Sequence, residues 1–422
     1  MLALIVWALY AAVLFISFFL LIVLLERGRI KKEVEFRDEW PELTLIIPAY
    51  NEEDTIKMTI DSIIDADYPD DKLELIVVND GSEDSTKEEV EPYTDEITLI
   101  NQENQGKGAA LNTGLEHVET DLFGCADADS RLKDDSLKYI VSELEEDAGG
   151  IASAMKVYKP KNLLQRLQWA EYLMGIFLRN IMSFIDSIHV TPGPLSIYRT
   201  EPVMELGGFD EESLVEDQEI TFKLQNAGWK ISHSQRGEVF TVAPDTVRKF
   251  YNQRYRWYKG SLQNIVKYKH MILNREYGDF GMFSIPTKIA QSALSVTALF
   301  IISYYLTKPI FDFANSITRI GVEAYIRALE TLTFSDIVRD IYWSFISIDV
   351  VSLWLLGSLL FLTLILYYMT VEHTDENMFA QGVIPVVIYI FWYFLFVGAI
   401  WLIVFIDSIK DHITEGDTEW QW

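Results

Sequence analysis

The sequence predicts an α/β domain built on a parallel sheet, with apolar helices before and after it that cross a membrane. Between about residues 35 and 271, short apolar runs alternate with helical patterns. This alternation indicates buried parallel strands with helices on both faces of the sheet. Long apolar segments flank the region on both sides, and half of the 422 residues are hydrophobic.

The first apolar segment, Leu2–Leu25, carries no charge and is long enough to span a bilayer. A cleaved signal peptide is the alternative, but the segment lacks a basic start and a small-residue cleavage site. Four basic residues follow it directly: Arg27, Arg29, Lys31 and Lys32. By the positive-inside rule they place the next region in the cytoplasm.

Three further crossings are predicted after the mixed region, over Ile285–Leu306, Val350–Tyr368 and Val383–Phe405. One crossing before the domain and three after it put the C-terminus outside. The loop Val371–Gly382 should then be cytoplasmic, although it is acidic; acidic residues contribute little to orientation. The sequence therefore predicts a multi-pass protein of the cell membrane with a cytoplasmic domain.

Charge and residue usage exclude several classes of ligand. The formal net charge of −28 argues against nucleic acid as a partner, because a broad acidic surface repels a polyanion. The single cysteine, Cys125, excludes an intrachain disulfide and a cysteine-based zinc site. The six histidines show no metal-binding spacing. A metal ion, if one binds, is therefore held by carboxylates.

The predicted strands end where polar side chains begin. The four apolar runs are Leu43–Pro48, Leu73–Val78, Ile97–Asn101 and Asp121–Ala126. In such sheets ligands bind at the carboxyl ends of the strands. Asp80 and Asp129 lie at two of these ends, and Asn51 follows a third. This edge of the sheet is the predicted ligand crevice, with a nucleotide as the expected occupant.

The acidic pair in the sequence FGCADADS points to a divalent cation. In extended backbone Asp127 and Asp129 point to the same side, where they repel each other unless a cation such as Mg²⁺ or Mn²⁺ lies between them. A solvated turn is the alternative. No glycine-rich phosphate-binding motif is present, so the metal would hold the phosphates. Lys107 either adds a charge to them or lies in solvent.

Two further segments carry candidate site residues. Glu216 and Asp217 begin a predicted helix within Leu214–Gly228, where they either act chemically or simply cap the helix. In the sequence QRYRW, Gln253, Arg256 and Trp257 share one helix face. That face can bind phosphate through arginine and stack through tryptophan, or it can anchor the helix at a membrane interface.

The segment Asn162–Ile188 is a predicted amphipathic helix. Apolar residues recur in it at helical spacing, and a few charges are interleaved with them. It is too polar for a crossing and too apolar for an exposed helix. We therefore expect it to lie in the membrane interface.

Together, the sequences PAYNE, VVNDGS, DADS, VEDQE and QRYRW resemble the motifs of membrane-bound, processive family 2 glycosyltransferases. This group includes the cellulose, chitin, poly-N-acetylglucosamine and hyaluronan synthases. The resemblance covers about residues 43–269. It implies a Rossmann-like GT-A domain that binds a UDP-sugar, with amphipathic interface helices and a transmembrane helical region.

The resemblance also implies a role for each motif. Asp80 contacts the uracil; Asp129, supported by Asp127, coordinates Mn²⁺ or Mg²⁺ and the diphosphate; Asp217 is the general base. The remaining donor-site residues are Tyr50, Asn51, Glu52, Lys107, Gln253, Arg256 and Trp257. The acceptor site is made of Gly193, Arg199, Glu216 and Trp257.

The implied domain boundaries are a membrane anchor (1–34), a cytosolic glycosyltransferase domain with the interface helix 162–188 (35–240), the QRYRW region (241–280) and three crossings with an acidic tail (281–422). The motifs depart from the family at Val215, where cellulose synthases have threonine, and no gating loop follows QRYRW. Three C-terminal crossings are also fewer than in the larger synthases, which puts a self-contained polymer channel in doubt.

The implied function is inverting transfer of a sugar from a UDP-sugar to a growing β-linked polysaccharide or oligosaccharide at the cytoplasmic membrane face. Export and a partner for it stay open. The alternative is a single addition to a membrane lipid, either a polyprenyl phosphate or a ceramide-like acceptor. A third hypothesis is a membrane sensor or scaffold that binds a nucleotide without catalysis.

Overall fold

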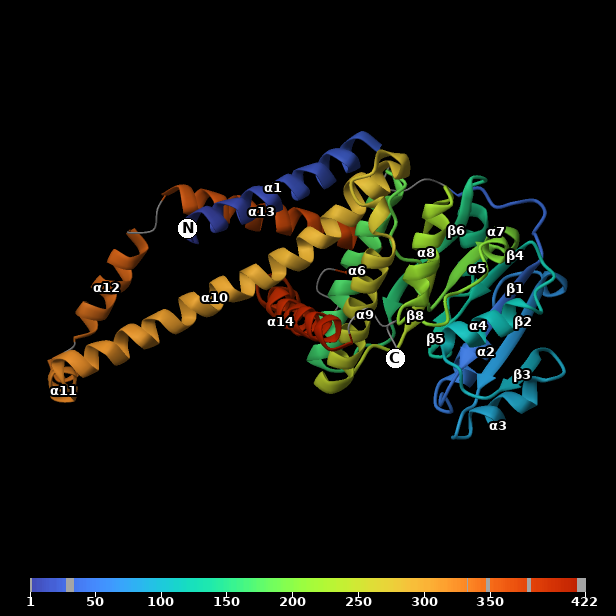
Figure 1. The fold of residues 1–422 in the computed structure, drawn as a ribbon, viewed down its shortest axis with the longest axis horizontal. Coiled ribbons are helices and arrows are strands. Elements are labelled where there is room, and N and C mark those ends of the chain that lie inside the picture. Colours follow the sequence, from blue (N-terminus) through green and yellow to red (C-terminus); the bar gives the residue numbers. More distant parts are fainter. Residues whose placement is uncertain (1, 28–33, 332, 347–349, 378–380, 416–422) are drawn as a thin grey trace.

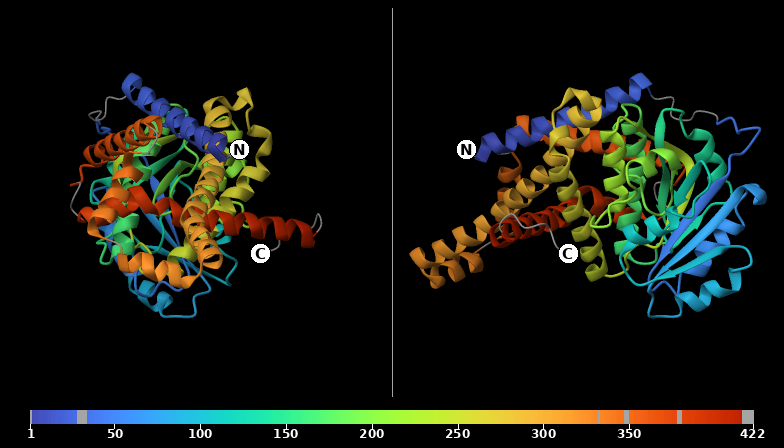
Figure 2. Two further views of the ribbon diagram at one scale, coloured as in Figure 1. Left: turned by 90° about the vertical axis from the view of Figure 1, so that its left-hand side faces the viewer. Right: turned by 45° about the vertical axis from the view of Figure 1, so that its right-hand side comes forward.

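The structure is a computed structural model that describes residues 2–27, 34–331, 333–346, 350–377 and 381–415. A sheet domain occupies one end of the molecule, and long apolar helices project from its other side (Figure 1). The right-hand view of Figure 2 shows the same separation. The predicted division into an α/β domain and a helical region is therefore confirmed.

The described strands form one eight-stranded sheet of order β3-β2-β1-β4-β7-β6-β8-β5. Their bounds are β1 Leu43–Ala49, β2 Leu73–Asp80, β3 Thr98–Gln102, β4 Leu122–Cys125, β5 Ser130–Leu132, β6 Ala148–Val157, β7 Ser196–Arg199 and β8 Lys230–Thr241. The four predicted strands, β1 to β4, pair in parallel. Strands β7 and β5 run antiparallel to their neighbours, so the sheet is mixed where a parallel one was predicted.

Helices cover both faces of the sheet, as continuous apolar strands require. On one face, α2 (Ile56–Ile64) and α5 (Ser136–Glu143) bury apolar side chains against β1. On the other, α4 (Lys107–Leu115) and α8 (Glu216–Asn226) pack against β1 and β4. The short helices α3 (Thr86–Val90) and α7 (Thr200–Glu205) follow β2 and β7. The N-terminal ends of α4 and α8 meet, because Lys107 and Glu216 begin the two helices and form an ion pair.

The apolar helices coincide with the four predicted crossings. They are α1 (Leu2–Arg27), α10 (Ile285–Ile320), α13 (Val350–His373) and α14 (Val383–Glu415). Among the described residues, two segments are long and apolar enough to cross a membrane, Phe280–Ile320 and Val383–Asp411. Helices α1 and α13 contain shorter apolar stretches. Two helices that the sequence did not predict, α11 (Val322–Thr331) and α12 (Phe334–Ile346), lie between α10 and α13.

Helix α6 (Leu163–Ser183) joins the two parts of the molecule. Leu173 and Ile176 lie in one apolar cluster with side chains of β6, α13 and α14, and Phe177 and Ile181 pack against α1. The apolar side chains that suggested an interface helix thus pack largely against other parts of the protein. The neighbouring helix α9 (Val247–Lys267) packs against α14.

Candidate active site

A cavity of about 660 Å³ opens at the carboxyl ends of β1, β2 and β4 and reaches helices α6, α8, α9 and α10. Its volume lies within the range of sites that enclose small ligands. Twelve of the predicted site residues line it: Tyr50, Glu52, Asp80, Lys107, Asp127, Asp129, Gly193, Glu216, Asp217, Gln253, Arg256 and Trp257. Motifs more than 200 residues apart in the sequence therefore meet in one cavity.

Two predicted site residues do not line this cavity, and each has a structural role elsewhere. The Asn51 side chain accepts a hydrogen bond of 2.8 Å from the amide of Glu83 and so joins the loops that follow β1 and β2. Arg199 lies on β7, where its Nε donates to the carbonyl of Ala148 at 2.9 Å. Arg199 thus braces the sheet, which corrects its predicted place at the acceptor site.

Asp80 ends β2 and is fixed by three hydrogen bonds. Oδ1 accepts from Gln102 Nε2 at 2.7 Å and from the amide of Gln105 at 2.9 Å, and Oδ2 accepts from the amide of Gly106 at 2.9 Å. These bonds hold the loop between β3 and α4 against the cavity. The carboxylate is therefore held rigidly at its edge.

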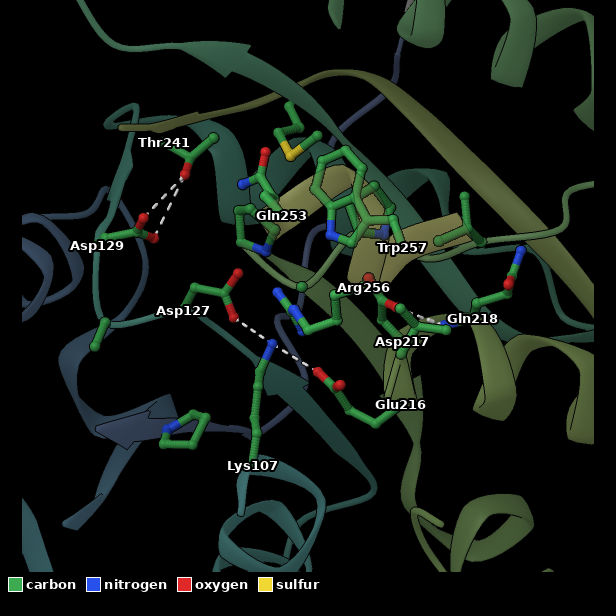
Figure 3. A pocket seen from close by; sticks show the side chains of 18 of the residues that line it. Lys107, Asp127, Asp129, Glu216, Asp217, Gln218, Thr241, Gln253, Arg256 and Trp257 are labelled. Carbon is green, nitrogen blue, oxygen red and sulfur yellow. Dashed lines mark hydrogen bonds and ion pairs between the residues drawn. The ribbon is translucent and has the colours of Figure 1, made fainter. Parts of the chain in front are cut away.

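Lys107 lies between two carboxylates at the centre of the cavity (Figure 3). Its Nζ is 2.6 Å from Asp127 Oδ1 and 2.6 Å from Glu216 Oε1. Burial favours the neutral amine, but the charges of Asp127 and Glu216 outweigh it and hold the pKa of Lys107 well above its ordinary value. The lysine is paired with both acids, and it ties α4 to the loop after β4 and to α8.

A close backbone approach at Gly193 completes this arrangement. A Cβ atom at this position would lie 2.8 Å from Lys107 Nζ and 2.9 Å from Asp127 Oδ2. Real carbon atoms essentially never approach so closely. A side chain at residue 193 would therefore force the ends of the Lys107 and Asp127 side chains to shift.

Asp129 has no cationic partner among the described residues. The Thr241 hydroxyl, at the end of β8, is 3.4 Å from each of its carboxylate oxygens. Burial, followed by the charges of Asp127 and Glu52, raises the pKa of Asp129 to about 7. The ionised form of Asp129 is therefore unfavourable, and a cation bound beside it would stabilise that form.

The donor set fits a divalent cation that a diphosphate helps to hold. In the described part of the chain, no three His, Cys, Asp or Glu side chains gather closely enough to bind a metal by themselves. Mg²⁺ is usually bound by one or two carboxylates together with substrate phosphates. Asp127 and Asp129 supply two carboxylates at the cavity wall, which meets that requirement.

Asp217 lies in the first turn of α8, and its Oδ1 accepts from the amide of Gln218 at 2.7 Å. Burial, and then the charge of Glu216, raises the pKa of Asp217 to about 6. For Glu216, burial is outweighed by the ion pair with Lys107, so its pKa is lowered. Their surroundings thus shift the pKa values of these two adjacent carboxyl groups in opposite directions. Such a separation suits Asp217 for proton transfer.

Helix α9 presents the predicted face of Gln253, Arg256 and Trp257 to the cavity. Arg256 donates to the carbonyl of Leu214 at 3.2 Å, which brings α9 to the start of α8. Arg254 is outside this face and is fully buried: its guanidinium forms an ion pair with Glu171 of α6 and donates to Gln253 Oε1 at 2.8 Å. It therefore supports the cavity from behind.

Several cavity residues were not predicted. Thr241, Arg179 on α6 and Lys288 on α10 all line it. Thr241 carries no local signal, because only the pairing of β8 with β5 brings it to Asp129. Lys288 had a signal, since it is a charge inside an apolar segment, and such charges are often functional.

Comparison with known proteins relates the sheet domain to a described family. Residues 44–207 match the family described as Glycosyl transferase family 2. The match spans the part of the sheet domain from β1 to α7, less than half of the chain.

Two curated relatives have the same description, poly-β-1,6-N-acetyl-D-glucosamine synthase. That of Staphylococcus aureus strain MSSA476 is 26% identical over 279 residues, which are 64% of this chain and 65% of the relative. That of Staphylococcus epidermidis is 24% identical over 316 residues, or 70% of this chain and 73% of the relative. The match to the first thus spans just under two thirds of its length.

A solved structure shares the fold. The mannosyltransferase from Pyrobaculum calidifontis, in complex with GDP-Man and Mn²⁺, superposes with a TM-score of 0.56. The superposition covers 88% of this chain and 97% of that one, at 19% sequence identity. The likeness therefore extends beyond the sheet domain into the helical region.

Proposed function

We propose that this protein is an inverting glycosyltransferase that moves a sugar from a UDP-sugar to the hydroxyl of a growing β-linked glycan at the cytoplasmic face of the cell membrane. The observation that carries the proposal is Asp217, a half-buried carboxyl of raised pKa in the same cavity as Asp127 and Asp129. The family 2 domain and the synthase relatives support the same reaction class.

The strand side of the cavity is the proposed donor site. Asp80, held by three hydrogen bonds, would accept from the uracil. Asp127 and Asp129 would hold Mg²⁺ or Mn²⁺ against the diphosphate, and the cation, when bound, would supply stabilisation of the charge on the leaving group. Arg256 and Gln253 face the same space from α9 and would bind phosphate oxygens.

Asp217 would act on the acceptor. A carboxyl whose pKa is raised toward neutrality is a stronger base than an ordinary aspartate and is still ionised at pH 7. It would take the proton of the acceptor hydroxyl as that oxygen bonds to the anomeric carbon and the bond from this carbon to UDP breaks. Direct displacement inverts the anomeric centre, so an α-linked donor gives a β-linked product.

Lys107 would keep the acids in distinct states. Because Lys107 pairs with Asp127 and Glu216, the carboxylate of Glu216, next to Asp217 in the sequence, is held in an ion pair. Gly193 would let the loop before β7 lie against this pair, and Trp257 would offer a stacking surface for a sugar ring.

A single addition to a membrane lipid is the second candidate. The cavity is bounded by α6, α9 and α10, and α10 makes up most of the apolar segment Phe280–Ile320. A lipid acceptor could therefore approach the cavity along a helix suited to a bilayer. Product length separates the two candidates.

The experiment is a transfer assay with membranes that contain the full chain, a panel of radiolabelled UDP-sugars and Mn²⁺ or Mg²⁺. Products are sized on a gel and also extracted into organic solvent. A polymer ladder supports the synthase, and a lipid-soluble product with one sugar supports the second candidate. Binding of UDP without turnover of any donor would contradict both.

A further inference from the structure

The membrane-side wall of the cavity holds two cations that the donor site does not use. Arg179 projects from α6 and Lys288 from the second turn of α10, and both line the cavity. Within the described ranges, neither has a carboxylate at ion-pair distance or a hydrogen-bond partner. The Nε atom of Arg179 is buried and unpaired.

The side chains of Arg179 and Lys288 both lie near His189 and Asp217. Both lie close enough to His189 to disfavour its protonation, and after burial these are the charges that hold its pKa well below the ordinary value. Arg179 and Lys288 both also interact electrostatically with the carboxylate of Asp217. Burial lowers the pKa of Arg179 to about 10, so the guanidinium is still charged at neutral pH. The pair therefore forms a positive end of the cavity beside the proposed base.

The other charges of the cavity already have proposed partners. Lys107 is neutralised by Asp127 and Glu216. Asp129 would be matched by the divalent cation, and Arg256 and Gln253 face the diphosphate. Arg179 and Lys288 are half-buried, and a half-buried cation without a counter-charge is unfavourable. A neutral glycan would leave Arg179 and Lys288 uncompensated, whereas an anionic group would satisfy both.

We propose that Arg179 and Lys288 form a binding site for the phosphate group of a lipid acceptor. The proposal rests on the proposed glycosyl transfer and names the acceptor class that its second candidate would use. Ser261 of α9, whose buried hydroxyl has no partner in the described structure and lines the same cavity, adds a neutral donor. Arginine and lysine side chains with a hydroxyl are a common phosphate-binding set.

The surroundings of Lys288 favour a lipid as the source of the phosphate. Ile289 and Met282 of the same segment are each 37% exposed, and Phe283 contacts Phe19 of α1 with ring centroids 4.1 Å apart. The positive end of the cavity thus adjoins apolar side chains of α1 and α10. A phosphate with an apolar chain can place its charge between the cations and its chain along these helices.

The test measures binding in the absence of donor, so that it does not depend on catalysis. The full chain in detergent is titrated with a radiolabelled branched-chain lipid phosphate, with the matching lipid alcohol and with inorganic phosphate as competitor. We expect the lipid phosphate to bind at least about tenfold more tightly than either. The double variant Arg179→Gln/Lys288→Gln should weaken it by about a hundredfold or more, since it removes two charged hydrogen bonds to the phosphate.

Arg166→Gln is the matched control, because Arg166 lies on the same helix with an unpaired, buried Nε but does not line the cavity. It should bind the lipid phosphate as the unmodified chain does. UDP affinity, measured with Mn²⁺, should be unchanged in both variants and shows that they are folded.

Three results would overturn the proposal. The double variant could bind lipid phosphate normally, or it could lose UDP affinity in the same proportion, which would place the cations at the donor diphosphate. Inorganic phosphate could also compete as strongly as the lipid, which would exclude the lipid source. Failure of the proposed function would appear differently, as absent UDP binding and absent donor turnover in the unmodified chain.

Discussion

The guanidinium carbon of Arg254 lies 4.2 Å from the ring centroid of Trp257, the tryptophan that faces the cavity. The same guanidinium is paired with Glu171, which also accepts a 2.7 Å hydrogen bond from the Tyr393 hydroxyl of α14. The position of Trp257 is therefore linked through one buried cation to α6 and to an apolar helix.

We predict that Arg254→Met lowers stability and raises KM. Removal of one partner of a buried ion pair leaves Glu171 uncompensated, which costs about 3–5 kcal/mol, and frees Trp257. The double variant Arg254→Met/Glu171→Gln should recover much of the stability but not the KM. Thermal unfolding and steady-state kinetics measure the two effects. If Trp257 is held by other contacts, the KM of both variants will stay normal.

Asp217→Asn should abolish turnover and stabilise the fold. Loss of the base should lower kcat by about 10²–10⁴. Because the folded-state pKa of Asp217 is raised to about 6, its ionised form is disfavoured in the folded chain at neutral pH, and an amide removes that cost. Calorimetry should show a higher Tm with UDP affinity kept. Lower stability together with lost UDP binding would instead indicate a structural role.

The same shift predicts the pH dependence of the reaction. Protonation of Asp217 below a pH of about 6 removes the base, so kcat should fall about tenfold per pH unit on the acid side. Saturating donor and cation hold the metal-binding carboxylates ionised during the measurement. Protonation of Asp217 stabilises the folded state, so unfolding through this group does not explain the loss. A kcat that is constant down to pH 5 would contradict the assignment.

Gly193→Ala should inactivate the protein with little loss of secondary structure. The added carbon would fall 2.8 Å from Lys107 Nζ, so the loop or the ion pair must move. We expect kcat/KM to fall at least about tenfold, since small displacements in a site are costly. Gly357→Ala, on α13 with no atom within 4 Å of the new carbon, is the control and should be fully active. Equal activity of the two variants would exclude a tight approach at residue 193.

Removal of divalent cations should weaken donor binding. With chelator present, the UDP diphosphate would face Asp127 and Asp129 without a bridging cation, and the charges repel. Titration calorimetry should show UDP binding restored by Mn²⁺ or Mg²⁺ in the unmodified chain and not in Asp129→Asn. Cation-independent affinity would refute the proposed metal site.

The fold was predictable where local pattern and topology agree. The apolar runs at β1 to β4 are short, continuous and followed by helical patterns, and each lies where predicted. The antiparallel strands were not predictable in the same way. Strand β7 has only four residues, and its direction depends on pairing with β4 and β6, which lie far away in the sequence.

The candidate site was likewise predictable only in part from the sequence. Asp80, Asp127 and Asp217 were predicted because each sits at a strand end or a helix start. The burial of Arg254 was not predicted, since helical spacing shows which residues share a face but not which neighbour covers the other face. Its burial depends on α6 and α14, more than 80 and 120 residues away, as the contacts with Glu171 and Tyr393 show.

The most direct test of the central claim is transfer from radiolabelled UDP-sugars by membranes that contain the unmodified chain or Asp217→Asn. The account predicts a labelled glycan or lipid-linked sugar with one of the donors, and its loss in the variant while UDP binding is kept. Labelled product of equal amount from both proteins would contradict the role of Asp217. Binding of UDP with no product from any donor would contradict the proposed glycosyl transfer itself.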